Sequence, residues 1–190
     1  MFVDKKYAKN QWVTTNYIPN YEEGHIGGSP ALDFQSYTRY MVYGDNEGIG
    51  RRGYRVGNPL RIAFANDFFR PIQGTYGVME LQPGQVNWGS INPQPLPGAV
   101  RLWMWSVFAG GGDFICTYRY RQPLYGTEQY HYGIVGTDGT TVTPGGREYE
   151  QFMKEIRQLR GQVAAREVKP ADYLARRTAI SFNHENSWSI

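Results

Sequence analysis

Apolar and polar positions follow two patterns along the chain. Short runs rich in β-branched and aromatic residues are typical of strands, and longer stretches with apolar residues three and four positions apart are typical of helices. The predicted elements, in chain order, are a strand at Gln11–Tyr17, a helix that begins at Pro59, a strand that ends near Glu80, a helix after Gly98, a strand at Phe114–Tyr118 and a helix marked by Tyr149 to Leu159.

The segment from about Pro19 to Asn58 contains no predicted element. It is rich in Gly and Tyr and is too long for a simple connection between two elements. We therefore predict that it forms a loop at an active site.

The order strand-helix, repeated three times, predicts an α/β fold with a parallel sheet and right-handed crossovers. Three such units cannot close a barrel, and a three-stranded parallel sheet on its own leaves two unpaired edges. The chain is therefore expected to be part of a larger fold.

Composition and charge argue against several classes of partner. The net charge is +3 and the basic residues are scattered, with Arg51-Arg52 and Arg176-Arg177 among the tight basic pairs. This is too little for a nucleic-acid footprint. The sequence also lacks the roughly 18 uninterrupted apolar residues of a membrane span, and its first residues do not follow the pattern of a signal peptide. We expect neither a nucleic acid nor a membrane as partner, and the sequence indicates no cellular location.

A single cysteine, Cys116, lies in an apolar strand run and is predicted to be a small core residue. One cysteine allows no disulfide within the chain and no cysteine cluster for zinc, so no metal site is predicted. Aromatic residues make up 15% of the chain, with Tyr the most frequent of them. Such residues suit sugar rings, and a Tyr-rich core explains them equally well.

Glu80 closes a short apolar strand, and Pro83-Gly84 break the chain just after it. Glu is disfavoured in strands, and the carboxyl ends of parallel strands are where ligands and catalytic groups collect. Trp88 brings an indole to the same edge. A carboxylate beside an indole is typical of a sugar site, although a structural pairing of Glu80 with an arginine is the alternative.

Several ordered motifs resemble glycoside hydrolase family 42, the β-galactosidases. The resemblance runs from about Trp12 to the end of the chain. Its motifs are Thr14-Thr15-Asn16, Val78-Met79-Glu80-Leu81-Gln82-Pro83-Gly84-Gln85-Val86-Asn87-Trp88, Asn92-Pro93, Pro97-Gly98, Arg101-Leu102-Trp103, Tyr118-Arg119-Tyr120-Arg121-Gln122 and Gly126-Thr127-Glu128-Gln129-Tyr130-His131-Tyr132-Gly133.

The resemblance implies that the chain is the C-terminal portion, about three βα units, of a TIM (β/α)8 barrel. Residues 1–165 would form this part of the barrel. Residues 166–190 would be a linker and the first strand of the next domain, because Ala175 to Phe182 and Glu185 to Trp188 look like the start of the family's second domain.

The resemblance also implies a retaining glycosidase that releases terminal β-D-galactose without a cofactor. Such enzymes use two carboxylates, one as nucleophile and one as acid/base. Glu80 matches the nucleophile, and we expect donors on neighbouring strands to hydrogen-bond it. The family's acid/base follows an Asn on the fourth strand, upstream of these motifs. The pair Asn46-Glu47 is therefore read as part of a solvated loop, and the acid/base is expected to be absent from this chain.

Further residues match family positions around the sugar. Glu128 and His131 correspond to residues that hydrogen-bond galactose hydroxyls, and Trp88 corresponds to an aromatic residue that lines the site. Tyr40 keeps an aromatic position of the family. Arg121 is expected to pair with a carboxylate near the edge of the site. The pairing would either stabilise the structure or contribute to substrate binding.

The chain departs from the family pattern at three positions: Tyr120 replaces a Trp, and Tyr37-Thr38 replace a Trp-Asp pair. These changes concern specificity more than reaction type. Two alternatives to a β-galactosidase stay open, a hydrolase of α-L-arabinopyranosides and a barrel remnant that binds carbohydrate without cutting it. The expected partners are a galactoside or oligosaccharide substrate and either copies of the chain, in a trimer as in the family, or the missing N-terminal half of the barrel.

Overall fold

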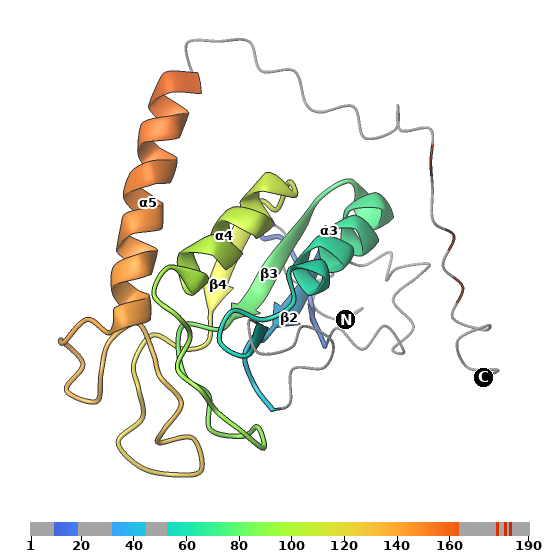
Figure 1. Cartoon of the computed structure of the whole chain (residues 1–190). Coiled ribbons are helices and arrows are strands. Elements are labelled where there is room, and N and C mark those ends of the chain that lie inside the picture. The colour runs from blue at the N-terminus through green and yellow to red at the C-terminus, as the bar shows by residue number, and fades with distance from the viewer. Residues whose placement is uncertain are drawn as a thin grey trace.

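A computed structural model describes residues 10–18, 32–44 and 53–163, together with the isolated positions 178, 181 and 183. Four strands and three helices are described (Figure 1): β1 (Asn16–Tyr17), β2 (Gln35–Arg39), α3 (Pro59–Gln73), β3 (Tyr76–Leu81), α4 (Ala99–Ala109), β4 (Phe114–Thr117) and α5 (Pro144–Val163).

The strands form one parallel sheet in the order β1-β2-β3-β4, which is also their order along the chain. Helices α3 and α4 lie on the same side of this sheet, and α5 packs against α4 (Figure 1). The predicted α/β fold with a parallel sheet is confirmed. Among the helices of the described residues, none is long and apolar enough to cross a bilayer.

The prediction of an uninterrupted loop at 19–58 is wrong, because β2 lies within it. Four of the five β2 residues are polar, so the strand lacks an apolar pattern, yet all five are buried. Hydrogen bonds partner some of the buried polar groups: Gln35 Nε2 donates to Gln73 Oε1 at 2.7 Å, and Tyr37 Oη donates to Asn66 Oδ1 at 2.8 Å. The strand that precedes α3 is therefore β2, and β1 is an additional strand before the three βα units.

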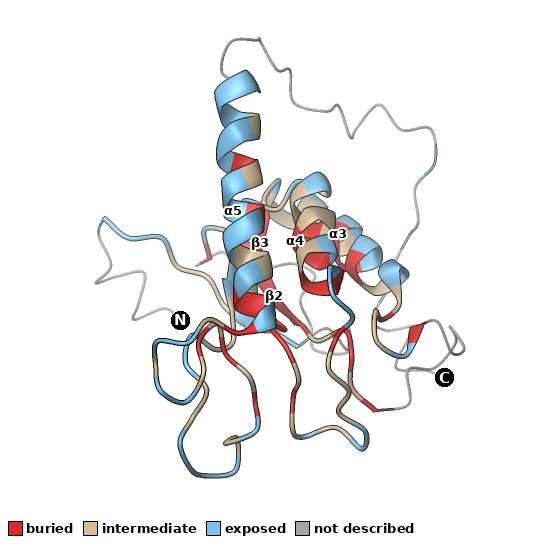
Figure 2. Ribbon diagram, turned by 60° about the vertical axis from the view of Figure 1, so that its left-hand side comes forward, coloured by how far each residue is buried: buried red, intermediate tan, exposed pale blue. Residues whose placement is uncertain are grey.

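The core lies between the sheet and helices α3 and α4. Tyr37 of β2 stacks on Phe69 of α3 at 5.1 Å and on Tyr76 of β3 at 6.1 Å between ring centroids. Trp103 of α4 is buried and donates its indole N–H to the Val56 carbonyl oxygen at 2.8 Å. Figure 2 shows the buried positions on β2, β3 and the sheet side of α3 and α4, whereas most of α5 is exposed. The high aromatic content therefore serves the core in part, because each buried ring removes a large apolar area from water.

Helix α3 begins at Pro59, as its sequence predicts. Asn58 caps its N-terminus by accepting a hydrogen bond from the Leu60 N–H at 2.9 Å, and Pro59 occupies the first helical turn. Gly74 ends the helix with a φ of 81°, in the left-handed region where a side chain is strained.

Helix α5 begins at Pro144, five residues before Tyr149, where the apolar pattern starts. Thr143 Oγ1 accepts from the Gly146 N–H at 3.0 Å and so caps the helix. A Cβ atom at Gly145 would lie 1.6 Å from the Pro83 carbonyl oxygen, so glycine is required where the helix meets the end of β3. Gly146 is likewise close to the Ile134 carbonyl oxygen, and the two glycines leave the first turn of the helix without apolar side chains that a sequence pattern could detect.

Cys116 is exposed, which corrects its predicted place in the core. It lies on β4, and β4 pairs only with β3 among the described strands, so no further strand of the described chain covers it. The predicted boundary at residues 165 and 166 falls outside the described residues.

Candidate active site

The Glu80 carboxylate lies at the carboxyl end of β3 and accepts two hydrogen bonds. Asn16 Nδ2 of β1 donates to Oε1 at 2.8 Å, and Tyr40 Oη, which follows β2, donates to Oε2 at 2.8 Å. Each carboxylate oxygen thus has its own uncharged donor. The expected hydrogen bonds to Glu80 are present, but Asn16 lies on β1, one strand beyond the neighbouring β2, and Tyr40 lies just after β2.

The register of the sheet brings these groups together. Tyr37 of β2 pairs with Val78 of β3, whereas the next residue, Thr38, pairs with Glu80, so β3 contains one extra residue at this point. Such a bulge turns the side chain that follows it, and bulges are frequent beside active sites. Here the bulge sets Glu80 directly beside Thr38.

Tyr40 links Glu80 to the aromatic residues of the site. Its ring meets Trp88 edge to face at 5.0 Å and His131 at 5.8 Å between centroids. Burial, followed by the hydrogen bond to Glu80, raises the pKa of the Tyr40 phenol well above its ordinary value, so the hydroxyl keeps its proton and remains a donor. Trp88 is 47% exposed, which leaves part of its surface open next to Tyr40.

His131 is fully buried beside Tyr40 and Tyr118. Its Nε2 lies 3.1 Å from the Tyr118 carbonyl oxygen, and a carbonyl oxygen only accepts, so Nε2 carries the proton. Burial lowers the pKa of the ring, which favours the neutral form. Nδ1 is then an acceptor, and it is buried without a hydrogen-bond partner among the described residues.

Glu128 is fixed by two neighbours at the end of β4. Tyr118 Oη donates to its Oε2 at 2.7 Å, and the Arg119 guanidinium forms an ion pair with the same oxygen. Arg119 also lies over the Tyr118 ring, 4.6 Å from its centroid. The peptide bond between Tyr118 and Arg119 is cis. These contacts, with those of His131, connect Glu128 to Tyr40 through adjacent rings.

Arg121 is not part of this arrangement, and the predicted pairing with a carboxylate is wrong for the described residues. Its Nε and Nη2 donate to the Thr137 carbonyl oxygen at 3.1 Å and 2.6 Å. Arg119, two residues earlier, pairs with Glu128 instead. Glu47 lies outside the described residues.

Sequence reasoning missed Asn16, Thr38, Tyr118 and Arg119 as residues of the site. Asn16 and Tyr118 stand near the carboxyl ends of predicted strands, the same signal that singled out Glu80. Thr38 had no such signal, because its strand was not predicted.

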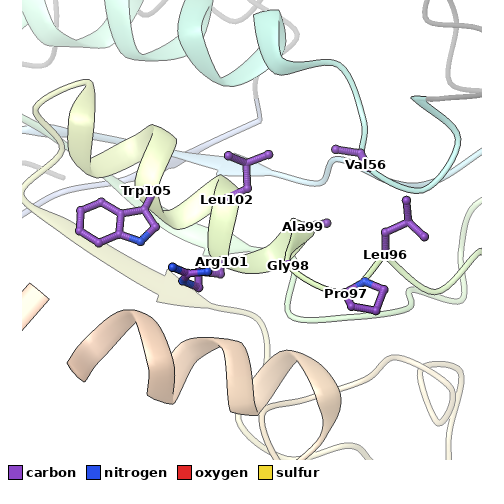
Figure 3. A pocket seen from close by; sticks show the side chains of 8 residues that line it. All are labelled: Val56, Leu96, Pro97, Gly98, Ala99, Arg101, Leu102 and Trp105. Atoms are coloured by element: carbon purple, nitrogen blue, oxygen red, sulfur yellow. The ribbon is translucent and has the colours of Figure 1, made fainter. Parts of the chain in front are cut away.

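A separate cavity of about 500 Å³ lies at the N-terminus of α4 (Figure 3). It shares no lining residue with the Glu80 site; its walls are formed by Val56, Leu96, Pro97, Gly98, Ala99, Arg101, Leu102 and Trp105. Within the described ranges, no group of three or more His, Cys, Asp or Glu side chains is placed to hold a metal ion.

A parallel α/β sheet that presents a hydrogen-bonded carboxylate and an exposed indole at its carboxyl edge has the features of a sugar-processing site. Comparison with known proteins identifies the family. The sequence profile of glycoside hydrolase family 42, described as β-galactosidase, matches residues 4–159, and the chain belongs to this family.

Two relatives illustrate the extent of the similarity. The β-galactosidase BgaA of Thermus sp is 30% identical over 193 residues, which cover 97% of this chain and 28% of the relative. The β-galactosidase BgaH of Haloferax lucentense is 30% identical over 190 residues, covering 96% of this chain and 26% of the relative. The chain thus spans just over a quarter of the length of these curated relatives.

Solved structures agree with the sequence comparison. The β-galactosidase of the psychrophilic Marinomonas ef1 superposes with a TM-score of 0.73 at 27% identity, over 84% of this chain and 26% of that chain. The β-galactosidase of Halorubrum lacusprofundi gives a TM-score of 0.72 at 30% identity, over 78% of this chain and 23% of that chain.

Proposed function

We propose that this chain is the C-terminal part of the (β/α)8 barrel of a retaining β-galactosidase, with Glu80 as the nucleophile. The observation that carries the proposal is the double hydrogen bond to Glu80 at a strand end, from Asn16 and Tyr40. Membership of a family whose relatives are named β-galactosidases supplies the substrate class.

In the first step the Glu80 carboxylate attacks the anomeric carbon of a β-galactoside. A bond forms between a Glu80 oxygen and that carbon while the bond to the leaving oxygen breaks, and a carboxylic acid donates its proton to the leaving oxygen. In the second step the same acid, now a carboxylate, takes a proton from water. The water oxygen bonds to the anomeric carbon, Glu80 leaves as a carboxylate, and the anomeric configuration is retained.

The acid/base is supplied by a part of the barrel that this chain does not include. A retaining enzyme needs the second carboxyl group about 5–5.5 Å from the nucleophile. Glu128 already accepts from Tyr118 and pairs with Arg119, so its role in the proposal is to accept hydrogen bonds from sugar hydroxyls. The exposed indole of Trp88 offers a surface for the sugar ring.

His131 has a more indirect role than its sequence position suggests. It is fully buried beside Tyr40 and Tyr118, so a sugar hydroxyl reaches its free Nδ1 only when a neighbouring side chain turns aside. Arg121 is held by the Thr137 carbonyl oxygen, and we leave it out of the proposed sugar site.

The remaining strands of the barrel cover the edges of this sheet. Trp12 is 64% exposed and packs against Phe34 at 5.2 Å and Phe114 at 6.1 Å, at the amino ends of the strands. An exposed aromatic group at the amino ends of the strands favours association. We propose the N-terminal half of the barrel as this partner, with a trimer of complete subunits as in the family.

The test is Glu80→Ala in the full-length gene product that contains this sequence, assayed on a nitrophenyl β-galactoside. Turnover is expected to be lost with the fold intact, and azide is expected to restore release of nitrophenol and to give a glycosyl azide of inverted configuration. Glu150→Ala, at an exposed position of α5, is the matched control. Near-normal hydrolysis by Glu80→Ala would exclude Glu80 as the nucleophile.

A further inference from the structure

The Asn16 side chain connects Thr38 to Glu80. Thr38 Oγ1 donates to Asn16 Oδ1 at 2.6 Å, and Asn16 Nδ2 donates to Glu80 Oε1 at 2.8 Å. These three residues come from β1, β2 and β3, so the chain of hydrogen bonds crosses three neighbouring strands at their carboxyl ends.

The direction of both hydrogen bonds follows from the chemistry of the groups. An ionised carboxylate only accepts, so Asn16 must turn its NH₂ toward Glu80 and its carbonyl oxygen toward Thr38. An amide oxygen only accepts as well, so the Thr38 hydroxyl must donate. The opposite orientation of the Asn16 amide would lose the hydrogen bond to Glu80 and set the Asn16 oxygen against the carboxylate. The Thr38 hydroxyl can accept as well as donate, so the carboxylate sets the orientation of the amide and Thr38 holds the amide in place.

The Glu80 carboxylate gains a fixed plane from this arrangement. The last torsion of a glutamate side chain is broad, so packing alone holds it weakly. A donor on Oε1 from one side and a donor on Oε2 from the other fix that rotation. Tyr40 provides the second donor, and its ring is itself held against Trp88 and His131.

The residues just before Asn16 are also hydrogen-bonded to the neighbouring segment of the chain. Thr14 Oγ1 and Ser36 Oγ lie 2.9 Å apart, and Thr14 Oγ1 donates to the Phe34 carbonyl oxygen at 2.9 Å. Ser36 also donates to the Thr15 carbonyl oxygen. These contacts hold the short strand β1 against β2 next to Asn16. Thr38 is only 8% exposed, so water competes little for its hydroxyl.

We infer that Thr38 and Asn16 are positioning residues, in which the Thr38 hydroxyl anchors the Asn16 side chain and the Asn16 amide fixes the Glu80 carboxylate for attack on the sugar. The inference rests on the proposed role of Glu80 as nucleophile. Small errors in the position of a reacting group reduce turnover strongly while they leave substrate binding nearly unchanged.

The experiment uses variants of the full-length gene product on a nitrophenyl β-galactoside. Thr38→Val keeps the shape and removes the hydroxyl, and we expect kcat to fall about 10-fold or more with KM within about twofold. Thr38→Ser restores the donor, and we expect kcat within about threefold of the wild type. Thr117→Val is the matched control for lost stability, because the Thr117 hydroxyl donates to the Leu81 carbonyl oxygen on the other side of β3.

A double-mutant cycle tests whether Thr38 acts through Asn16. Asn16→Ala alone should lower kcat at least as much as Thr38→Val, and the double variant should be no worse than Asn16→Ala. Fully additive losses, an unchanged kcat in Thr38→Val, or a Thr38→Ser variant as poor as Thr38→Val would each overturn the inference.

Two further arms separate this inference from the proposed function. If Glu80→Ala keeps its activity in the same assay, the proposed nucleophile is wrong, whatever Thr38 does. The hydrogen bonds themselves are followed by the NMR signals of the Asn16 side-chain amide, which should shift in both Thr38→Val and Glu80→Gln. An Asn16 signal that responds to neither variant would overturn the proposed chain of hydrogen bonds from Thr38 through Asn16 to Glu80, independently of any activity measurement.

Discussion

The side chain of Gln82 and the backbone of Val42 exchange two hydrogen bonds. Gln82 Oε1 accepts from the Val42 N–H at 2.8 Å, and Gln82 Nε2 donates to the Val42 carbonyl oxygen at 2.9 Å. The same side chain accepts from the Met41 N–H and donates to the Gly84 carbonyl oxygen. It therefore joins the end of β3 to the segment that follows Tyr40, directly behind the Glu80 site.

Replacing Gln82 should destabilise the fold markedly. Gln82→Leu leaves several buried backbone groups of residues 41, 42 and 84 without partners, and we expect a loss of about 2–4 kcal/mol in the free energy of unfolding. Urea denaturation of the variant measures this loss. Gln85→Leu is the control, because the Gln85 amide donates one hydrogen bond, to the Asn92 carbonyl oxygen. Equal losses in the two variants would contradict the prediction.

Tyr40→Phe should reduce turnover while it preserves the packing of the site. The variant keeps the ring against Trp88 but removes the donor to Glu80 Oε2, so we expect kcat to fall about 10- to 100-fold. Tyr43→Phe is the matched control, since Tyr43 also packs against Trp88 while its hydroxyl faces Arg61. Steady-state kinetics on an aryl galactoside distinguish the two, and an unaffected Tyr40→Phe would remove Tyr40 from the site.

Glu128→Ala should lower kcat/KM more than it weakens binding of a ground-state galactose analogue. This difference is expected if Glu128 holds sugar hydroxyls more tightly in the transition state than in the ground state. The comparison requires kcat/KM on an aryl galactoside and an inhibition constant for the analogue. Unchanged kcat/KM would place Glu128, and its partners Tyr118 and Arg119, outside the site.

The stability of the protein should fall as the pH drops below about 6.5 because of His131. Burial is the largest cause, and it lowers the pKa of the ring below the ordinary 6.5. The charge of Arg119 also lowers this pKa, whereas the charges of Glu128 and Glu80 raise it. The unfolded state then binds a proton more readily than the folded state. The contribution of neutral His131 to the free energy of unfolding is complete above the ordinary pKa of histidine. It is lost as the pH falls below that value, and the free energy of unfolding decreases by no more than about 1.4 kcal/mol per pH unit.

Urea denaturation between pH 7.5 and about 5 measures this effect, and His131→Gln should reduce its slope. Glutamine keeps a side-chain donor for the Tyr118 carbonyl oxygen without titrating in this range. His25 and His184 lie outside the described residues and contribute equally to both proteins. The same slope in variant and wild type would show that His131 is not the titrating group.

Elements with a clear apolar pattern were predicted well. The helix after Gly98 and the strand that contains Glu80 agree with α4 and β3, because one face of each packs directly into the core. Strand β2 could not be predicted in this way. Its buried Gln35, Ser36 and Arg39 read as loop residues, and it is the tertiary contacts that bury them.

The candidate site shows the same division. Glu80, Trp88 and Tyr40 could be proposed from motifs and strand ends, since those signals are local in sequence. The role of Asn16 depends on the register between three strands and on a bulge next to Thr38, and neither is visible in the sequence. Which of Arg119 and Arg121 pairs with a carboxylate depends on the backbone path after β4, and the sequence does not define that path.

The strands lie in the sheet in the same order as along the chain, and this order affects how the protein folds during synthesis. Because synthesis proceeds from the N-terminus, β1 and β2 leave the ribosome before β3. The donors Asn16, Thr38 and Tyr40 are therefore available when the Glu80 strand arrives, and its carboxylate can exchange water for protein donors as it docks. Each later unit adds to a neighbour that already exists, so the nascent chain never has to reopen a finished pair of strands to build this edge of the sheet.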